Sequence, residues 1–131
     1  MPTFRYSKLV RDNVPGFHIQ DGHIVNGRQL QGEELIRALI DKLHEEADEV
    51  RAALSRQELI EELGDVQQVI DDICSLSGVS KDELLADIAK KTARKGGFSE
   101  GQYIESVTMP DEDDEWVEYC RNNPDKYPEI K

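Results

Sequence analysis

Two acidic, amphipathic segments with almost no chain between them constrain this fold most. From Glu33 to Leu54 the apolar residues recur at three- and four-residue steps, which predicts an amphipathic helix. Ser55 and Glu58 then form a capping-box pattern, so we expect a second helix from there to about Leu76. Because the connection is so short, the two helices are expected to fold back on each other as an antiparallel hairpin.

A third helix and two less regular flanks complete the expected fold. Ser80 and Glu83 repeat the capping pattern, which predicts a helix over residues 81–95. Short apolar alternations at residues 21–30 and 102–107 predict a small two-stranded antiparallel β-ribbon. The expected fold class is therefore all-α: a helical hairpin plus a third helix, with a small two-stranded β-ribbon from the flanks.

The chain has the length of one domain, and its end differs in composition. We expect a domain over residues 1–107 and an acidic C-terminal tail over residues 108–131, which forms either a short helix around Trp116 or a mobile segment. Three helices leave much apolar surface uncovered, so we expect a homodimer, assembled as an oligomeric helix bundle. The residues that indicate this surface are Ile36, Ile40, Ile60 and Cys74.

Net charge narrows the classes of partner. The chain has 16 Lys and Arg residues against 28 Asp and Glu residues, a formal net charge of −12, which disfavours binding to nucleic acid polymers or to anionic membranes. Cys74 and Cys120 form no disulfide framework and no metal-binding Cys pair. The first twenty residues lack the apolar stretch of a signal peptide, and no later segment has membrane-spanning length. We therefore expect a cytoplasmic protein.

Four carboxylates are expected to converge between the first two helices. At about 100° per residue, Glu46 and Glu49 lie on one flank of the first apolar stripe, and Glu62 lies within the second, with Asp65 one turn further on. Like charges this close repel each other, and a hard divalent cation such as Mg²⁺ removes the repulsion. The alternative is an ordinary solvated acidic face. It is as plausible as a functional role for Glu45, Asp48, Glu58 and Glu61, but less so for Glu62 among its apolar neighbours.

These residues carry a family resemblance. Glu45-Glu46, Glu49, Glu62 and Asp65 resemble the EExxE…ExxD pattern of the all-α nucleoside triphosphate pyrophosphohydrolases, the MazG-like superfamily that includes phosphoribosyl-ATP pyrophosphohydrolase. The segments KLVRDNVP and KKTARKGGF are similar to segments that flank the helices in a compact branch of that superfamily. The resemblance covers about residues 6–107 and departs in detail over residues 16–31.

The resemblance implies a hydrolase that works on nucleotides. It implies Mg²⁺-dependent hydrolysis of a nucleoside triphosphate to the monophosphate and pyrophosphate in nucleotide-pool house-cleaning, with Mn²⁺ as an alternative ion, and assembly as a homodimer or homotetramer. It also implies that Glu46, Glu49, Glu62 and Asp65 are the metal ligands. Glu45 or Glu49 is expected to orient or deprotonate the attacking water, and the sequence does not choose between them.

Basic residues are expected to contact the substrate phosphates. Lys91, Arg94 and Lys95 share a face at the end of the third helix, although cations there are also favoured by the helix dipole. Lys8 and Arg11 are further candidates, with bridging to the acidic helices as the alternative. Two other functions remain open: hydrolysis of phosphoribosyl-ATP, and a non-enzymatic acidic helical module that binds a basic partner.

Overall fold

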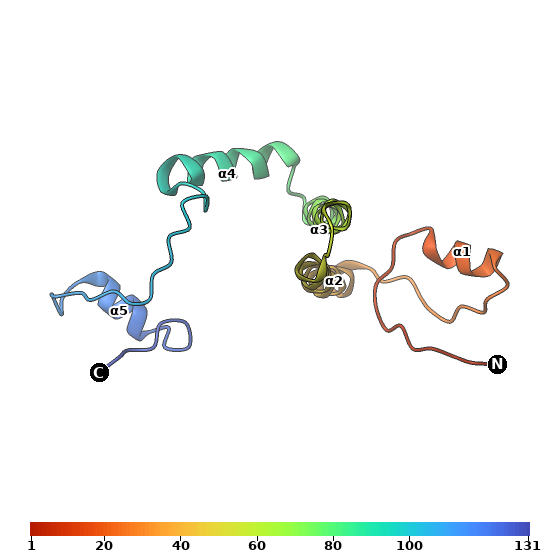
Figure 1. Cartoon of the computed structure of the whole chain (residues 1–131), viewed down its shortest axis with the longest axis horizontal. Coiled ribbons are helices and arrows are strands. Elements are labelled where there is room, and N and C mark those ends of the chain that lie inside the picture. The colour runs from red at the N-terminus through yellow and green to blue at the C-terminus, as the bar shows by residue number, and fades with distance from the viewer. The chain divides into compact units, whose positions relative to one another are not determined.

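The computed structural model describes all 131 residues and contains helices but no strands. Its contacts divide the chain into two compact units, Met1–Arg94 and Lys95–Lys131. The five helices are labelled in Figure 1: α1 (Val14–Gln20), α2 (Gly32–Ala52), α3 (Arg56–Leu76), α4 (Lys81–Lys95) and α5 (Glu115–Arg121). The prediction of an all-α fold is confirmed.

Helices α2 and α3 form the centre of the first unit. Figure 1 shows them side by side, viewed almost along their axes, and they make by far the most extensive contact between elements. Leu39 of α2 and Val69 of α3 are the buried apolar residues. The chain that joins the two helices, residues 53–55, is too short for any arrangement other than a tight return, so the predicted hairpin is confirmed.

Both predicted capping patterns are present. The Ser55 hydroxyl accepts a hydrogen bond from the Glu58 amide at 3.1 Å, and the Glu58 carboxylate accepts one from the Leu54 amide at 2.8 Å. Ser80 and Glu83 make the reciprocal pair at the start of α4, at 3.1 and 2.9 Å. These bonds satisfy amides that a helix start leaves without partners, which is why the sequence located the starts of α3 and α4 well.

The single chain covers little of its apolar surface. Leu39 and Val69 are the only buried apolar residues, whereas Ile60, Leu63 and Leu85 remain about half exposed, at 46%, 51% and 51%. No helix combines the length and the apolar character needed to cross a lipid bilayer. The packing of one chain therefore leaves apolar faces on α3 and α4 without a partner.

The N-terminal region contains a helix that the sequence pattern did not predict. Helix α1 begins after Asn13 and carries Pro15 in its first turn, where a missing amide hydrogen costs nothing. His18, at the end of α1, hydrogen-bonds His23 through their Nδ1 atoms at 2.9 Å. With only seven residues and none buried, α1 offers too short a pattern for periodicity to detect.

The predicted β-ribbon is wrong. Residues 21–30 and 102–107 contain no strand, and they belong to different compact units. Their apolar side chains are exposed, with Ile24 at 78% and Tyr103 at 87%. A two-stranded ribbon is only marginally stable in water unless one face packs on a core, and neither segment has such a core to cover.

The second unit is built around α5. The Asp114 carboxylate caps this helix by accepting a hydrogen bond from the Trp116 amide at 2.9 Å. Arg121 of this helix forms ion pairs with Glu129 and Glu112, at 2.7 and 2.9 Å. These pairs connect the chain before the helix and the chain after it to the same side chain. The observed boundary between the units follows Arg94, and Trp116 lies in the first turn of α5.

Candidate active site

Three carboxylates from α2 and α3 meet across the hairpin. Glu46 comes from α2, and Glu62 and Asp65 come from α3. Each offers one carboxylate oxygen, and these oxygens all lie within 4.8 Å of one another. We refer to these three residues as the acidic triad. Nothing in the local sequence of either helix alone brings these oxygens together, because the contact depends on the packing of α2 against α3.

Helix geometry explains how each helix presents its acids. Glu62 and Asp65 are three residues apart, so they lie on neighbouring positions of one face of α3. Glu46 lies on the face of α2 that packs toward α3 and is only 8% exposed. A buried carboxylate is costly unless it is paired with a cation or hydrogen-bonded, so Glu46 requires a positive partner.

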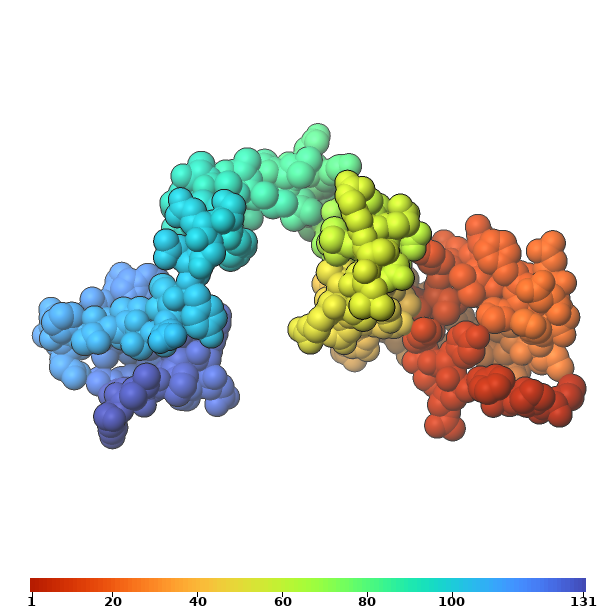
Figure 2. Space-filling model, viewed as in Figure 1, coloured from red at the N-terminus to blue at the C-terminus, as the bar shows by residue number.

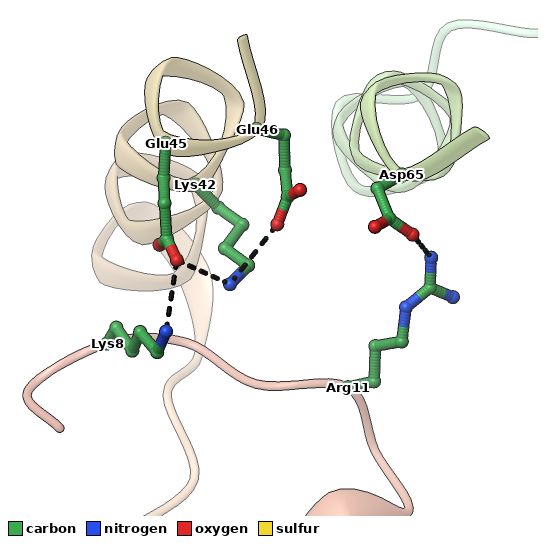
Figure 3. A network of polar contacts seen from close by, with 6 residues as sticks. All are labelled: Lys8, Arg11, Lys42, Glu45, Glu46 and Asp65. Atoms are coloured by element: carbon green, nitrogen blue, oxygen red, sulfur yellow. Dashed lines mark hydrogen bonds and ion pairs between the residues drawn. The ribbon is translucent and has the colours of Figure 1, made fainter. Parts of the chain in front are cut away.

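Lys42 supplies that partner from one turn earlier on the same helix. Its Nζ lies 3.4 Å from a carboxylate oxygen of Glu46 and 3.3 Å from one of Glu45. Glu45 also accepts a hydrogen bond from Lys8 at 3.1 Å. Figure 3 shows Lys42 between the two glutamates, with Lys8 approaching Glu45 from the N-terminal segment. Lys42 was not among the residues predicted for the site, although its spacing to Glu45 and Glu46 already indicated these contacts.

Arg11 reaches the triad from the same N-terminal segment. Its guanidinium donates a hydrogen bond to the Asp65 carboxylate on α3. Lys8 and Arg11 therefore link the N-terminal segment to both helices of the hairpin, as Figure 3 shows. In the space-filling view the N-terminal residues, in red, meet the hairpin, in yellow and green (Figure 2).

Charge in the site shifts two pKa values in opposite directions. Partial burial raises the pKa of the Glu62 carboxyl, and the neighbouring carboxylates of Asp65, Glu46 and Glu49 raise it further. Partial burial acts in the same sense on Glu45, but hydrogen bonds from Lys8 and Lys42 outweigh it and hold the pKa of Glu45 below its usual value. Glu62 is thus the member of the triad without a cation beside it.

The donor atoms of the triad fit a hard divalent cation. All three donors are carboxylate oxygens, and neither histidine nor cysteine joins the group. Mg²⁺ prefers oxygen ligands and is held in proteins by a few carboxylates together with water and phosphate oxygens. A cation between these residues also relieves the repulsion that raises the pKa of Glu62. Glu46, Glu62 and Asp65 are therefore able to hold a metal ion of this class.

The other predicted site residues lie outside the triad. Glu49 is exposed and contributes no oxygen to the group, although its charge acts on Glu62. Glu45 is engaged by two lysines. The basic residues at the end of α4, which are Lys91, Arg94 and Lys95, are exposed. Their roles stay predictions.

Comparison with known proteins identifies a family for the central part of the chain. The family described as phosphoribosyl-ATP pyrophosphohydrolase matches residues 27–92, which is half of the chain and includes α2, α3 and the whole triad. Neither the curated proteins nor the solved structures gave a significant match.

Proposed function

The chain belongs to the phosphoribosyl-ATP pyrophosphohydrolase family and is thus a hydrolase of phosphoanhydride bonds, and we propose that it is a Mg²⁺-dependent nucleoside triphosphate pyrophosphohydrolase. The products are a nucleoside monophosphate and pyrophosphate, and the role is removal of unwanted nucleotides from the pool. The observation that carries this proposal is the acidic triad between α2 and α3, inside the matched region.

Different residues of the site are proposed to bind the metal ion and to orient the attacking water. Glu46, Glu62 and Asp65 would hold the ion, and Glu49 would be a further ligand at the exposed edge of the site. Mg²⁺ would supply neutralisation of charge on the leaving pyrophosphate and would acidify a water molecule. Either Glu45 or Glu49 would orient the attacking water and accept its proton. Glu45, held ionised by Lys8 and Lys42, is suited to orienting water through a fixed carboxylate.

Cations of the chain neutralise the triphosphate. Lys8 and Arg11 already lie at the site, and Arg11 is able to contact two phosphate oxygens at once. Lys91, Arg94 and Lys95 are the second group of candidates, since all three are exposed. A triphosphate carries several negative charges, so contributions from both groups are compatible with one substrate.

A second substrate is favoured by the family itself. The matching family is described as phosphoribosyl-ATP pyrophosphohydrolase, so phosphoribosyl-ATP is the alternative substrate of the same site. The chemistry is identical, because phosphoribosyl-ATP also contains a triphosphate that is cleaved to release pyrophosphate. The two substrates differ only in the base and its substituent.

One assay with a matched pair of variants tests the proposal. The full chain is incubated with Mg²⁺ and a panel of canonical, deoxy and oxidised nucleoside triphosphates and phosphoribosyl-ATP, and the products are separated by ion-exchange chromatography. We expect pyrophosphate, not orthophosphate. We also expect a loss of about 100-fold or more in Glu62→Gln, and little change in Glu61→Gln, whose carboxylate is exposed and only bonds Gln57. Orthophosphate release, or full activity in Glu62→Gln, would contradict the proposal.

We further propose that the chain works as a homo-oligomer, either a dimer or a tetramer. The support is the apolar surface that one chain leaves open, with only Leu39 and Val69 as buried apolar residues. A monomer of this size normally buries a larger core, and symmetric pairing of helices is the usual way to cover such faces.

A further inference from the structure

Cations around the acidic triad are held in two different ways. Lys42 lies on the same helix as its partner Glu46, and its side chain is only 16% exposed. Arg11 lies in an N-terminal segment without regular structure, and its side chain is 58% exposed. Exposed ion pairs contribute little stability, so the pair of Arg11 with Asp65 is the one that is easily broken.

Arg11 occupies a ligand of the proposed metal site. Asp65 belongs to the triad, and Arg11 donates a hydrogen bond to one of its two carboxylate oxygens. Either oxygen of a carboxylate is able to bind a cation. Glu46 has Lys42 beside it, and Glu62 has no cation partner. A metal ion that binds all three carboxylates therefore either binds Asp65 beside the guanidinium of Arg11 or displaces it.

Repulsion between like charges favours the exchange over simple addition. The guanidinium of Arg11 and a metal ion bound by Asp65 are both positive and would share one carboxylate. Their mutual repulsion weakens both contacts, so departure of Arg11 lowers the electrostatic cost of metal binding.

We propose that Arg11 and a divalent cation are alternative partners of Asp65, so that Arg11 weakens metal binding by the empty site and becomes free when the metal binds. This inference rests on the proposed function, since it takes Asp65 to be a metal ligand. The freed guanidinium has a geometry that suits phosphate oxygens. Lys8 remains paired with Glu45, which is outside the triad, and so keeps Arg11 near the site. The exchange favours metal that arrives together with a triphosphate.

Metal binding without nucleotide tests the competition directly. Mn²⁺ binding to the full chain is measured by electron paramagnetic resonance and by titration calorimetry. We expect Arg11→Gln to bind Mn²⁺ about 2- to 5-fold more tightly than the unmodified chain, as the loss of an exposed ion pair implies. Arg11→Lys, which keeps the charge, should bind close to the unmodified chain. The matched control is Arg5→Gln, which removes a charge from an exposed position of the same segment.

Two results of the Mn²⁺ titrations would exclude competition between Arg11 and the metal ion. Binding by Arg11→Gln that is no tighter than binding by Arg5→Gln, or that is weaker, excludes competition. Absence of Mn²⁺ binding in every variant excludes it too. A second measurement covers the case in which Arg11→Gln fails to fold by circular dichroism. The Nε–Hε resonance of Arg11 in the unmodified chain should shift on addition of Mg²⁺, and an unchanged resonance counts against the exchange.

Failure of this inference and failure of the proposed function give different results. Pyrophosphate release by the unmodified chain, with unchanged metal affinity in Arg11→Gln, leaves the function standing and removes the competition. Tighter Mn²⁺ binding in Arg11→Gln, with no pyrophosphate release by the unmodified chain, supports the competition and removes the proposed function.

Discussion

Glu46 of α2 and Glu62 of α3 oppose each other across the hairpin, each with a carboxylate oxygen within 4.8 Å of the other and of Asp65. Glu46 has a counterion in Lys42 at 3.4 Å, whereas repulsion from its neighbours adds to partial burial in raising the pKa of Glu62. Repulsion between the carboxylates of Glu46 and Glu62 is therefore not fully compensated by Lys42, and a cation bound between them would reduce it.

Stability without metal should depend on the ionisation of Glu62. Its pKa is raised above the ordinary 4.5, so the folded chain takes up this proton before the unfolded chain does. Ionised Glu62 therefore lowers the free energy of unfolding. This destabilisation is fully present above the pKa of Glu62 in the folded chain, and it is lost as the pH falls toward 4.5. In EDTA, Glu62→Gln should therefore melt a few °C above the unmodified chain at pH 7.5, as expected for a small domain, and the difference should vanish near pH 4. Thermal unfolding followed by circular dichroism measures it. A difference that stays constant with pH, or that Glu61→Gln reproduces, would be incompatible with this account.

Glu46 and Glu49 should contribute unequally to metal binding. Glu46→Gln removes a member of the triad and is expected to weaken Mn²⁺ binding by about 10-fold or more. Glu49→Gln should weaken it by less than about threefold, because this ligand is exposed and its charge is better screened by solvent. Titration calorimetry on the two variants decides the point. Equal losses would show that burial does not distinguish the two ligands.

Loss of the cap between the hairpin helices should destabilise the first unit. Ser55→Ala removes the acceptor of the Glu58 amide at the start of α3 and is expected to cost about 1 kcal/mol of unfolding free energy. Urea denaturation followed by helical circular dichroism measures this cost. Ser75→Ala, at an exposed position within α3, serves as the control and should change stability by less than about 0.5 kcal/mol. If Ser55→Ala and Ser75→Ala lower the free energy of unfolding equally, the cap does not determine the start of α3.

Self-association should depend on the open apolar faces. Ile60 of α3 is 46% exposed in one chain, which is high for an isoleucine in the central hairpin. Ile60→Glu should shift the protein to a smaller species in sedimentation velocity, and Gln57→Glu, one turn earlier on the same helix, should not. A purified chain that is monomeric at all concentrations would refute the proposed assembly.

The tail unit should depend on a single arginine. Arg121 pairs with Glu112 and Glu129, and it holds the pKa of the Glu129 carboxyl below its usual value. Arg121→Gln should speed amide hydrogen exchange over α5 by about a few-fold, because these exposed contacts are individually weak. Exchange in α2 and α3 should not change, since these helices belong to the other unit. Unchanged exchange in α5 would show that the aromatic contact of Trp116 with Tyr119 stabilises this helix without Arg121.

Local sequence determined the helical centre of this protein. The starts of α3 and α4 depend on side-chain bonds between Ser and Glu residues three positions apart, so a short window contains the information. The spacing of Glu62 and Asp65 on one face of α3 is local for the same reason. Helix α1 escaped prediction because seven residues with no buried face leave little periodicity to read.

Tertiary structure decided which charged groups meet. Periodicity placed Glu46 and Glu49 on the same flank of α2, and only the packing against α3 buried the first and left the second exposed. The pair of Arg11 with Asp65 joins residues 54 positions apart, which no local pattern specifies. The β-ribbon failed in the same way, since alternation alone does not supply a core for strands to cover. The sequence thus determined the helices and their acids, and long-range packing determined which of those acids share a site, because electrostatic contacts depend on distance in space.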